Sequence, residues 1–423
     1  MTSPGLRLRP PRQEDFSTRL RSQAVTARVG LWLGICFGIA FVTGLWSHYG
    51  QDIPGWLAWP TSPSWGYRLT QGLHVTAGSA AVPLLLVKLW SVYPRLFQMV
   101  PRRPSRTVLL HVLERGSIGV LVAAALFQLA TGLMNSSQWY PWSFSFRSAH
   151  YAIGWLAIGS LVLHVGVKLP IIRRALTGPV EQEDTAHIPP EAGDADDASD
   201  EDVDESSDVS AAGATVRSED PSGSGWITRR GLLRTTWVAA GLAAVSTAFG
   251  GTLPGLRTVS VFGVRSGEGP QGVPINRSAT AAAVLPAAQD PGWRLMLVNG
   301  DTTTELSLAD LEAMPQHTAS LPIACVEGWS ASAEWTGVRV SDLLAMVDAP
   351  AESDVLVQSL QQRLSFGSSV LPGNVAADPD TLLALQLFGE TLHIDHGFPC
   401  RIIAPNRPGV WQTKWVSRLE VLT

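Results

Sequence analysis

The chain has 423 residues, of which 45% are hydrophobic and 16% are charged, and its formal net charge is −5 at pH 7. This length leaves room for two or three domains, and its 3 cysteines do not suggest a disulfide framework. The sequence has no glycine-rich nucleotide-binding loop, no Ser-His-Asp arrangement and no nucleic-acid-binding signature, so we expect no nucleic-acid partner.

Four apolar stretches in the first 175 residues are each long enough to cross the hydrocarbon core of a bilayer. They cover about 29–47, 69–92, 108–134 and 149–170. Basic residues precede the first stretch, separate the second from the third and follow the fourth, whereas the other two loops are rich in Trp and Tyr. The positive-inside rule then places the amino terminus in the cytoplasm. We expect residues 1–175 to form a multi-pass domain in a bacterial cell membrane.

Histidines inside these apolar stretches are candidate metal ligands, because imidazole in a membrane span is rare and usually functional. His150 and His164 lie 14 residues apart, which on one helix puts them on nearly the same face, about 21 Å apart. His74 is level with His150, near the outer surface, and His111 is level with His164, near the inner one. We therefore predict an outer haem held by His74 and His150, and an inner haem held by His111 and His164. Unrelated buried histidines are the plainer interpretation.

A weak internal repeat supports the haem prediction. Thr43-Gly44-Leu45-Trp46 recurs as Thr131-Gly132-Leu133-Met134, and the His74-x-x-x-Gly78 pattern recurs at His150. The duplicated hairpin resembles the four-helix, bis-histidine cytochrome b type, which implies haem b. The counterpart of His164 on the second stretch is Lys88, so the number of haems, one or two, stays open. His48, at the outer end of the first stretch, is an alternative outer ligand.

Residues 176–226 differ sharply in composition from what precedes them. Between 180 and 222 there are fifteen acidic residues, one arginine and no aromatic residue, which is typical of a disordered linker. Residues 227–252 follow with Arg229-Arg230 and an apolar run, which resembles a twin-arginine export signal. An ordinary fifth span with a cytoplasmic basic anchor is the alternative. Either interpretation places residue 260 onward outside the cytoplasm, and the first adds the twin-arginine export machinery as a partner.

Residues 260–423 are predicted to form a mixed α and β domain. Short apolar runs indicate strands at Leu295–Val298, Leu321–Ala324 and Arg401–Ala404. Helices are predicted near Ser307–Ala313, with Ser307 as the N-cap, near Val340–Val347 and near Asp380–Leu387.

The run Leu-Pro-Ile-Ala-Cys-Val-Glu-Gly-Trp-Ser at 321–330 ends an apolar strand in a turn that carries one thiol, Cys325. A soft thiolate suits a thiophilic metal whose other ligands come from a cofactor, although free cysteine is also among the residue types most often buried for packing alone. The sequence of this run resembles the molybdenum-ligand segment of the sulfite oxidase superfamily, and in particular that of its methionine-sulfoxide reductase branch.

The resemblance continues to the end of the sequence, through Trp335-Thr336-Gly337, Asp395-His396-Gly397-Phe398-Pro399-Cys400-Arg401 and Thr413-Lys414-Trp415. It implies molybdenum-molybdopterin as cofactor, with Cys325 as catalytic metal ligand. The residues it assigns to the pterin are His396, Arg401, Lys414 and Trp335, with Asn276 and Arg277 as looser matches. A phosphate-bearing pterin needs converging cationic donors.

The predicted fold is therefore a membrane four-helix bundle plus a fifth anchor helix, followed by a mixed α+β sulfite oxidase-type molybdopterin-binding domain. The predicted function is a molybdopterin-dependent oxidoreductase that exchanges electrons with the quinone pool through haem b and reduces a sulfoxide or similar small oxide. Oxidation of sulfite or a related sulfur compound is the alternative, which Ser330 disfavours because sulfite oxidases carry an anion-binding arginine there. A non-catalytic binding protein on a membrane anchor is a third hypothesis.

Overall fold

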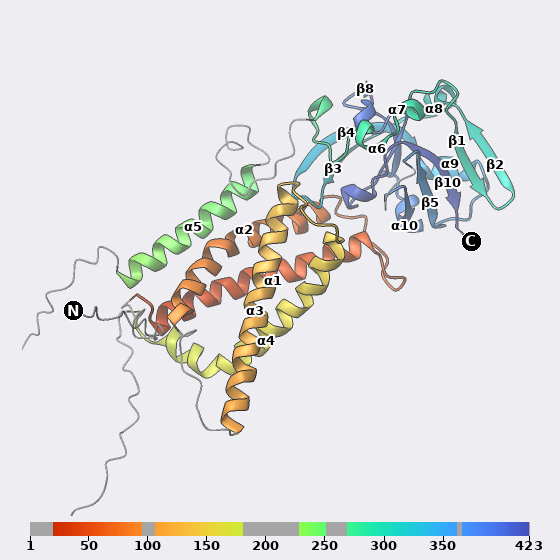
Figure 1. The fold of residues 1–423 in the computed structure, drawn as a ribbon. Helices are drawn as coiled ribbons and strands as arrows, with labels where there is room; N and C mark the ends of the chain where they lie inside the picture. Colours follow the sequence, from red (N-terminus) through yellow and green to blue (C-terminus); the bar gives the residue numbers. More distant parts are fainter. Residues whose placement is uncertain (1–19, 95–105, 181–227, 251–268, 362–365, 423) are drawn as a thin grey trace, which may run out of the picture.

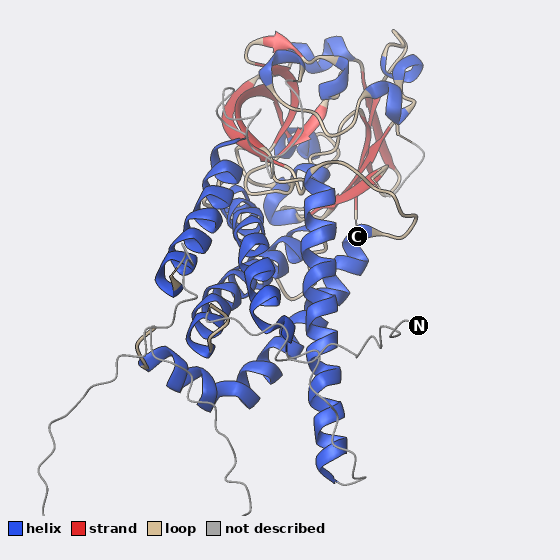
Figure 2. Ribbon diagram, turned by 60° about the vertical axis from the view of Figure 1, so that its left-hand side comes forward, coloured by secondary structure: helices blue, strands red, loops and turns tan. Residues whose placement is uncertain are grey.

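The computed structural model describes residues 20–94, 106–180, 228–250, 269–361 and 366–422, without the side chains of 106–114 and 250. A helical half precedes a half built on two β-sheets (Figures 1 and 2). Within the described residues, five helices are long and apolar enough to cross a membrane, as predicted. They are α1 (Gln23–Gln51), α2 (Gly66–Val92), α3 (Arg106–Ser136), α4 (Phe146–Thr177) and α5 (Arg229–Gly250).

Helices α1, α2, α3 and α4 begin before the four predicted apolar stretches, and all except α2 also end beyond them. Ser22 caps α1 by accepting a hydrogen bond from the Val25 amide, and Ser145 caps α4 in the same way. α4 continues to Thr177, two residues past the expected domain boundary. Most of the predicted acidic linker, 181–226, lies outside the described residues.

Helices α1 and α2 pack together, as do α3 and α4, and α1 also contacts α4. α5 packs on α2, where Leu233 joins a buried apolar cluster with Val29 and Leu84. At its start, the buried Arg229 side chain donates a hydrogen bond to the Val180 carbonyl. The arginine pair is thus part of the helix assembly rather than a separate tail.

The second half contains two five-stranded sheets. The first has the order β2-β1-β10-β5-β6, in which only β1 and β10 are parallel. Its strands are β1 (Leu295–Asn299), β2 (Thr302–Leu306), β5 (Val355–Ser359), β6 (Ser368–Leu371) and β10 (Val416–Val421). The second is antiparallel, with the order β3-β4-β7-β8 and β9 beside β7. Its strands are β3 (His317–Ala324), β4 (Ser330–Arg339), β7 (Leu382–Leu387), β8 (Glu390–Thr391) and β9 (Arg401–Ile403).

The short helices cover the sheets, and most local predictions are confirmed. They are α6 (Ala279–Ala282), α7 (Leu285–Ala288), α8 (Leu308–Ala313), α9 (Val340–Ala345) and α10 (Gly373–Ala376). Ser307 caps α8 in a reciprocal capping box with Asp310. The helix predicted near Asp380–Leu387 is wrong, because this segment is strand β7. Five of the six β7 residues are buried, and a short continuous apolar run cannot be distinguished from a buried helix by its pattern.

The loop between α1 and α2 joins the two halves. Its Trp59 is 1% exposed and belongs to the main apolar core of the sheet half. The Trp59 indole donates to the Asn406 carbonyl at 2.8 Å, and the Asn374 amide donates to the Trp59 carbonyl at 2.8 Å. The ends of α1 and α2 that flank this loop therefore abut the sheet half through buried contacts (Figure 1).

Candidate functional site: a thiol turn between two cavities

Cys325 lies in the turn that connects β3 to β4. The Cys325 amide donates to the Trp329 carbonyl at 2.9 Å, and the Gly328 amide donates to the Cys325 carbonyl at 3.0 Å. Gly328 has a φ of 99°, which a residue with a side chain adopts only with strain. The glycine therefore allows the chain to reverse immediately after the thiol, and the side chain of Cys325 is held inside the protein, 1% exposed.

Glu327 is the nearest charged neighbour of the thiol. Burial, followed by the charge of Glu327, raises the pKa of Cys325 above its ordinary value. Burial also raises the pKa of Glu327, whose carboxylate accepts hydrogen bonds from the Gln138 amide at 2.8 Å and the Trp329 indole at 3.0 Å. A bound cation would reverse this preference for the neutral thiol, because metal coordination deprotonates a thiol.

A cavity in the sheet half brings Cys325 together with most of the residues predicted to hold the pterin. They are Asn276, Arg277, His396, Arg401 and Lys414, and all of them line this cavity with Cys325. Trp335 is the exception among the predicted residues. It is buried in the core and does not line the cavity, but the Arg401 guanidinium lies over its ring at 5.0 Å. Its place is thus beneath Arg401.

Burial lowers the pKa values of the cationic groups around this cavity. It lowers the pKa of Lys414 to about 7, with a smaller contribution from the charge of Arg401, and the pKa of Arg401 to about 9. Burial likewise lowers the pKa of His396 to about 4, although its bond to the Pro270 carbonyl acts in the opposite direction. The charges of Asp395 and Cys325 raise the pKa of Lys414, but they do not offset the effect of burial.

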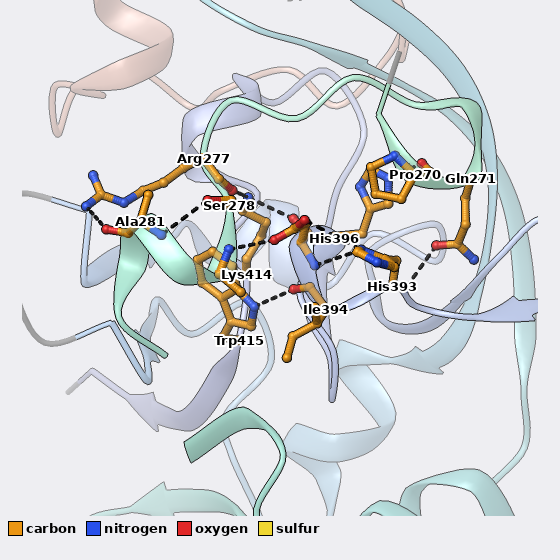
Figure 3. Close-up of polar contacts among 12 residues, drawn as sticks. Pro270, Gln271, Arg277, Ser278, Ala281, His393, Ile394, His396, Lys414 and Trp415 are labelled. Atoms are coloured by element: carbon orange, nitrogen blue, oxygen red, sulfur yellow. Dashed lines mark hydrogen bonds and ion pairs between the residues drawn. The ribbon is translucent and has the colours of Figure 1, made fainter. Parts of the chain in front are cut away.

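Figure 3 shows the contacts of Lys414 and Arg277, in which the Arg277 guanidinium donates to the Ala281 carbonyl at 2.6 Å. Lys414 donates to the backbone carbonyls of Arg277 and of Asp395, the latter at 3.0 Å, and lies over the Trp415 ring at 4.5 Å. The buried Nε atoms of Arg277 and Arg401 have no hydrogen-bond partner. Buried donors without partners are costly. The residues present therefore fit an anionic group such as the phosphate of a pterin, with Cys325 as the one sulfur ligand.

A second cavity lies among the membrane helices and is lined by both predicted outer haem ligands, His74 and His150. Their ring centres are 6.2 Å apart, with an angle of 68° between the ring planes. Two imidazoles bound to opposite sides of one metal, at about 2 Å per bond, would place their ring centres on the order of 6 Å apart. The histidine pair therefore fits a single metal between them.

The repeated Thr-Gly pairs orient these two histidines. The Thr131 hydroxyl donates to the Phe127 carbonyl at 2.6 Å, so its oxygen accepts from Nδ1 of His150 at 3.0 Å. Nδ1 of His74 donates to the Ala40 carbonyl at 2.8 Å and lies 3.4 Å from the Thr43 hydroxyl. In both rings the proton is on Nδ1, which leaves Nε2 as a potential metal ligand.

Glycine at position 44 permits this close approach, since a Cβ there would lie 2.9 Å from Cε1 of His74. His48 lines the same cavity but is stacked on Tyr151, with ring centres 3.7 Å apart. It does not lie opposite either histidine of the pair as a ligand would.

The predicted inner pair is not brought together in the part of the chain that the structure describes. His164 does not line the helix cavity, and the side chain of His111 lies outside the described residues. Lys88, the counterpart of His164 in the repeat, donates to the Thr26 carbonyl at 2.9 Å. The inner haem therefore stays a prediction.

The helix cavity reaches the residue next to Cys325, and Cys325 itself lines the other cavity. Val326 lines the helix cavity, and its carbonyl accepts hydrogen bonds from the side-chain amides of Gln71 at 3.0 Å and Asn135 at 3.1 Å. Sequence reasoning missed these contacts, as it missed Glu327 and Gln138. The sequence contains one signal that could have identified Gln71 and Asn135, which is their spacing from the repeat residues. Gln71 precedes His74 by three residues, and Asn135 follows Thr131 by four.

Comparison with known protein families identifies the sheet half. Residues 282–423 match the family described as "Oxidoreductase molybdopterin binding domain". By this match the segment is an oxidoreductase-type molybdopterin-binding domain, and relatives of the chain include sulfite oxidases. Mitochondrial sulfite oxidase of Mus musculus is 29% identical over 158 residues, which cover 30% of this chain and 29% of that one.

A protein of Azospira oryzae, provisionally named protein-methionine-sulfoxide reductase subunit YedZ1, is 31% identical over 115 residues, or 27% of this chain and 43% of that one. The matched stretches thus span less than half the length of these curated relatives. The solved structure of sulfane dehydrogenase SoxCD from Paracoccus pantotrophus aligns over 31% of this chain and 38% of that one, at 25% identity and a TM-score of 0.28. That similarity is too partial to bear on the fold.

Proposed function

We propose that this protein is a membrane oxidoreductase that couples oxygen-atom transfer in the molybdopterin-binding domain to electron exchange through haem b among the membrane helices. One observation carries the proposal: the cavity lined by His74 and His150 reaches Val326, the residue after Cys325. The proposed haem site, which transfers one electron at a time, and the proposed molybdenum site, which transfers two, would then lie on either side of one short turn.

In the sheet half, Cys325 would bind molybdenum, while Arg401, Lys414 and Arg277 would hold the anionic part of the pterin. When bound, molybdenum-molybdopterin supplies two-electron oxygen-atom transfer. The protein contributes one sulfur ligand, buried cationic donors and an enclosed site. His396 stays neutral above about pH 4 and donates to the Pro270 carbonyl, so it orients the cofactor segment rather than adding charge.

In the helical half, His74 and His150 would bind haem b through Nε2. When bound, haem b supplies one-electron transfer. The lipid-facing helices suggest the quinone pool as the exchange partner. A second haem at His111 and His164 would require ligands that the described cavity does not include.

Reduction of a sulfoxide is the favoured reaction. A sulfoxide would take up two electrons and two protons to give a thioether and water, with quinol as the source of both electrons. The sulfoxide-reductase name of the Azospira oryzae relative supports this direction. So does Ser330, which starts β4 where an anion-binding arginine would be expected for sulfite.

Oxidation of sulfite is the second candidate, because several relatives are named as sulfite oxidases. Sulfite and water would give sulfate, two electrons and two protons, and the electrons would flow inward to quinone. In the part of the chain that the structure describes, Ser330 does not line the Cys325 cavity. The cations that do so remain available to an anionic substrate.

One experiment separates these reactions and tests the cofactors. The full-length protein is purified in detergent and analysed for haem b absorbance and molybdenum. Dithionite-reduced protein is then mixed with sulfoxides and N-oxides, and oxidised protein with sulfite, while the haem spectrum is followed. We expect reoxidation by a sulfoxide. Protein that lacks both haem b and molybdenum would favour the non-catalytic binding hypothesis.

The sheet half is proposed to be exported folded by the twin-arginine machinery and to lie outside the cytoplasm of a bacterial cell. Replacing Arg229 and Arg230 with lysine keeps the positive charge but should strand this half in the cytoplasm. Protease protection of the exterior domain in spheroplasts would report the outcome. Normal export of the variant would instead support an ordinary fifth span.

A further inference from the structure

We propose that Gln71 and Asn135 are positioning residues that form the electron-transfer junction between the Cys325 turn and the histidine cavity. The inference rests on the proposed function, and it names the contact through which the two sites exchange electrons. It is built from side chains of the membrane helices, none of which contacts the predicted pterin cavity.

The junction converges on one backbone atom. The Val326 carbonyl accepts from Nε2 of Gln71 at 3.0 Å and from Nδ2 of Asn135 at 3.1 Å. Both amides are almost completely buried, with 5% and 7% exposed. Val326 follows Cys325 directly, so each hydrogen bond lies one residue from the sulfur ligand.

Each amide is fixed so that its NH₂ group faces Val326. The oxygen of Gln71 accepts from the Ser47 hydroxyl at 3.2 Å, and the oxygen of Asn135 accepts from the Tyr140 hydroxyl at 2.9 Å. Because an amide has one oxygen and one nitrogen end, these bonds specify which end is left for the carbonyl. The orientation is therefore built by the surrounding helices and loop.

Each amide also connects to one of the two histidines. Gln71 lies three residues before His74, which is about one turn of α2. Asn135 lies four residues after Thr131 on α3, and Thr131 accepts the hydrogen bond of His150. The internal repeat thus provides two short routes from Val326, one to each histidine.

Simple docking of the two halves does not require these bonds. Trp59 is buried in the core of the sheet half, Trp411 donates to the Gln51 carbonyl at 2.7 Å, and Arg68 donates to Ser332 at 2.8 Å. None of these three contacts is made by residues 325–329 or to the Val326 carbonyl. The Gln71 and Asn135 bonds act instead on the turn itself, where they fix the distance between the thiol and the histidines while single electrons cross, two for each oxygen atom transferred.

The test uses the full-length protein with Gln71→Met and Asn135→Leu, singly and together, and Ser332→Ala as the matched control. Methionine and leucine keep the approximate volumes but cannot donate to the carbonyl. Ser332→Ala also removes a hydrogen bond between the halves, but one made to β4 and not to the Val326 carbonyl. If the double variant does not fold, the same measurements are made on the two single variants.

Two measurements decide the result. In cofactor-free protein, amide hydrogen exchange of the peptide covering 325–329 should accelerate on the order of tenfold in the double variant, since each net hydrogen bond contributes modestly. In loaded protein, substrate-driven reoxidation of reduced haem should slow, while turnover with reduced viologen, which supplies electrons directly to the sheet half, should match wild type. Ser332→Ala should change neither.

Wild-type rates of haem reoxidation in the double variant would overturn the inference, as would unchanged exchange of 325–329. A purely structural role would lower viologen-driven turnover together with haem reoxidation, and this too would overturn it. Failure of the proposed function is distinguishable, because wild-type protein would then lack haem, molybdenum or substrate-driven reoxidation before any variant is made.

Discussion

Single residues in this protein take their roles from their neighbours rather than from their type. Cys325 and Cys400 are both fully buried cysteines, with 1% and 0% exposed, and burial raises the pKa of both thiols. Cys400 packs in the core, where its sulfur lies 3.6 Å from the Val416 carbonyl. Cys325 lines a cavity of cationic side chains on a turn opened by glycine. That difference favours Cys325 over Cys400 as the ligand of the proposed molybdenum site.

Cys325→Ser should therefore abolish substrate-driven haem reoxidation, because a hard hydroxyl is a poor substitute for a thiolate with a thiophilic metal. Part of the molybdenum should remain, since the cofactor supplies the other ligands, and haem b absorbance should be unchanged. Cys400→Ser is the matched control and should reoxidise haem at the wild-type rate. Wild-type haem reoxidation in Cys325→Ser would contradict the ligand assignment.

Lys414 gives the cofactor cavity a pH dependence. Because its pKa is lowered to about 7, the amine is charged at pH 6 and largely neutral at pH 8. Below about pH 7 the folded protein carries the full cost of this buried charge, and the cost falls steadily as the pH rises from about 7 toward the ordinary lysine pKa of 10.5. An anion favours the charged form, so binding above pH 7 requires proton uptake and weakens by about tenfold per pH unit.

We therefore expect sulfate, a dianion throughout this range, to bind cofactor-free protein more tightly at pH 6 than at pH 8 by on the order of tenfold. Calorimetric titration at both values would measure the difference. His396 and Arg401 titrate near pH 4 and pH 9 and contribute little in this window. Lys414→Met should bind weakly at both values, and equal affinity of the wild type at pH 6 and pH 8 would refute the assignment.

At the scale of elements, two helical hairpins provide equivalent parts. α1 and α2 bring Thr43 toward His74, and α3 and α4 bring Thr131 toward His150. In each case the threonine hydroxyl donates to the carbonyl four residues earlier, which fixes its lone pairs toward the imidazole. The repeat seen in the sequence is thus a repeat of ligand orientation.

Thr131→Val should lower haem affinity by about 10–100-fold, because it removes the hydrogen-bond partner that orients His150 while keeping the side-chain shape. Haem titration of cofactor-free protein, followed by absorbance, would measure the affinity. Thr236→Val is the control, since the buried Thr236 on α5 makes the same bond to its own helix, at 2.7 Å to Leu232, outside the cavity. Equal losses in both variants would indicate a general effect on helix packing.

At the scale of the whole molecule, the membrane helices and the sheet half share one apolar core. Trp59 and Tyr67, from the first outer loop and the start of α2, belong to the same cluster as strands β1, β5 and β10. The Tyr67 hydroxyl lies 2.9 Å from the Ser47 hydroxyl, which in turn donates to Gln71 of the junction. Docking of the two halves and placement of the Cys325 turn are therefore connected physically.

Trp59→Ala should destabilise the protein by about 3–5 kcal/mol, the usual cost of truncating a buried tryptophan. Equilibrium denaturation of detergent-solubilised protein, followed by circular dichroism, would measure the change. Trp56 in the same loop is 74% exposed, so Trp56→Ala is the matched control and should stay within about 0.5 kcal/mol of wild type. Comparable losses from both variants would mean that the loop acts as a whole rather than through Trp59.

The sequence alone determined the five apolar helices, the capped start of α8 and the residues around the pterin cavity, because these depend on local patterns and short motifs. The sequence pattern predicted a helix where the structure has β7, because a short apolar run is compatible with both a buried strand and a buried helix. It could not place Trp335 beneath Arg401 or find Gln71 and Asn135, which lie roughly 190–255 residues from Val326 in the sequence. Only the tertiary structure decided that the cavity lined by His74 and His150 reaches Val326, next to Cys325, because that contact depends on how two separately patterned halves pack against each other.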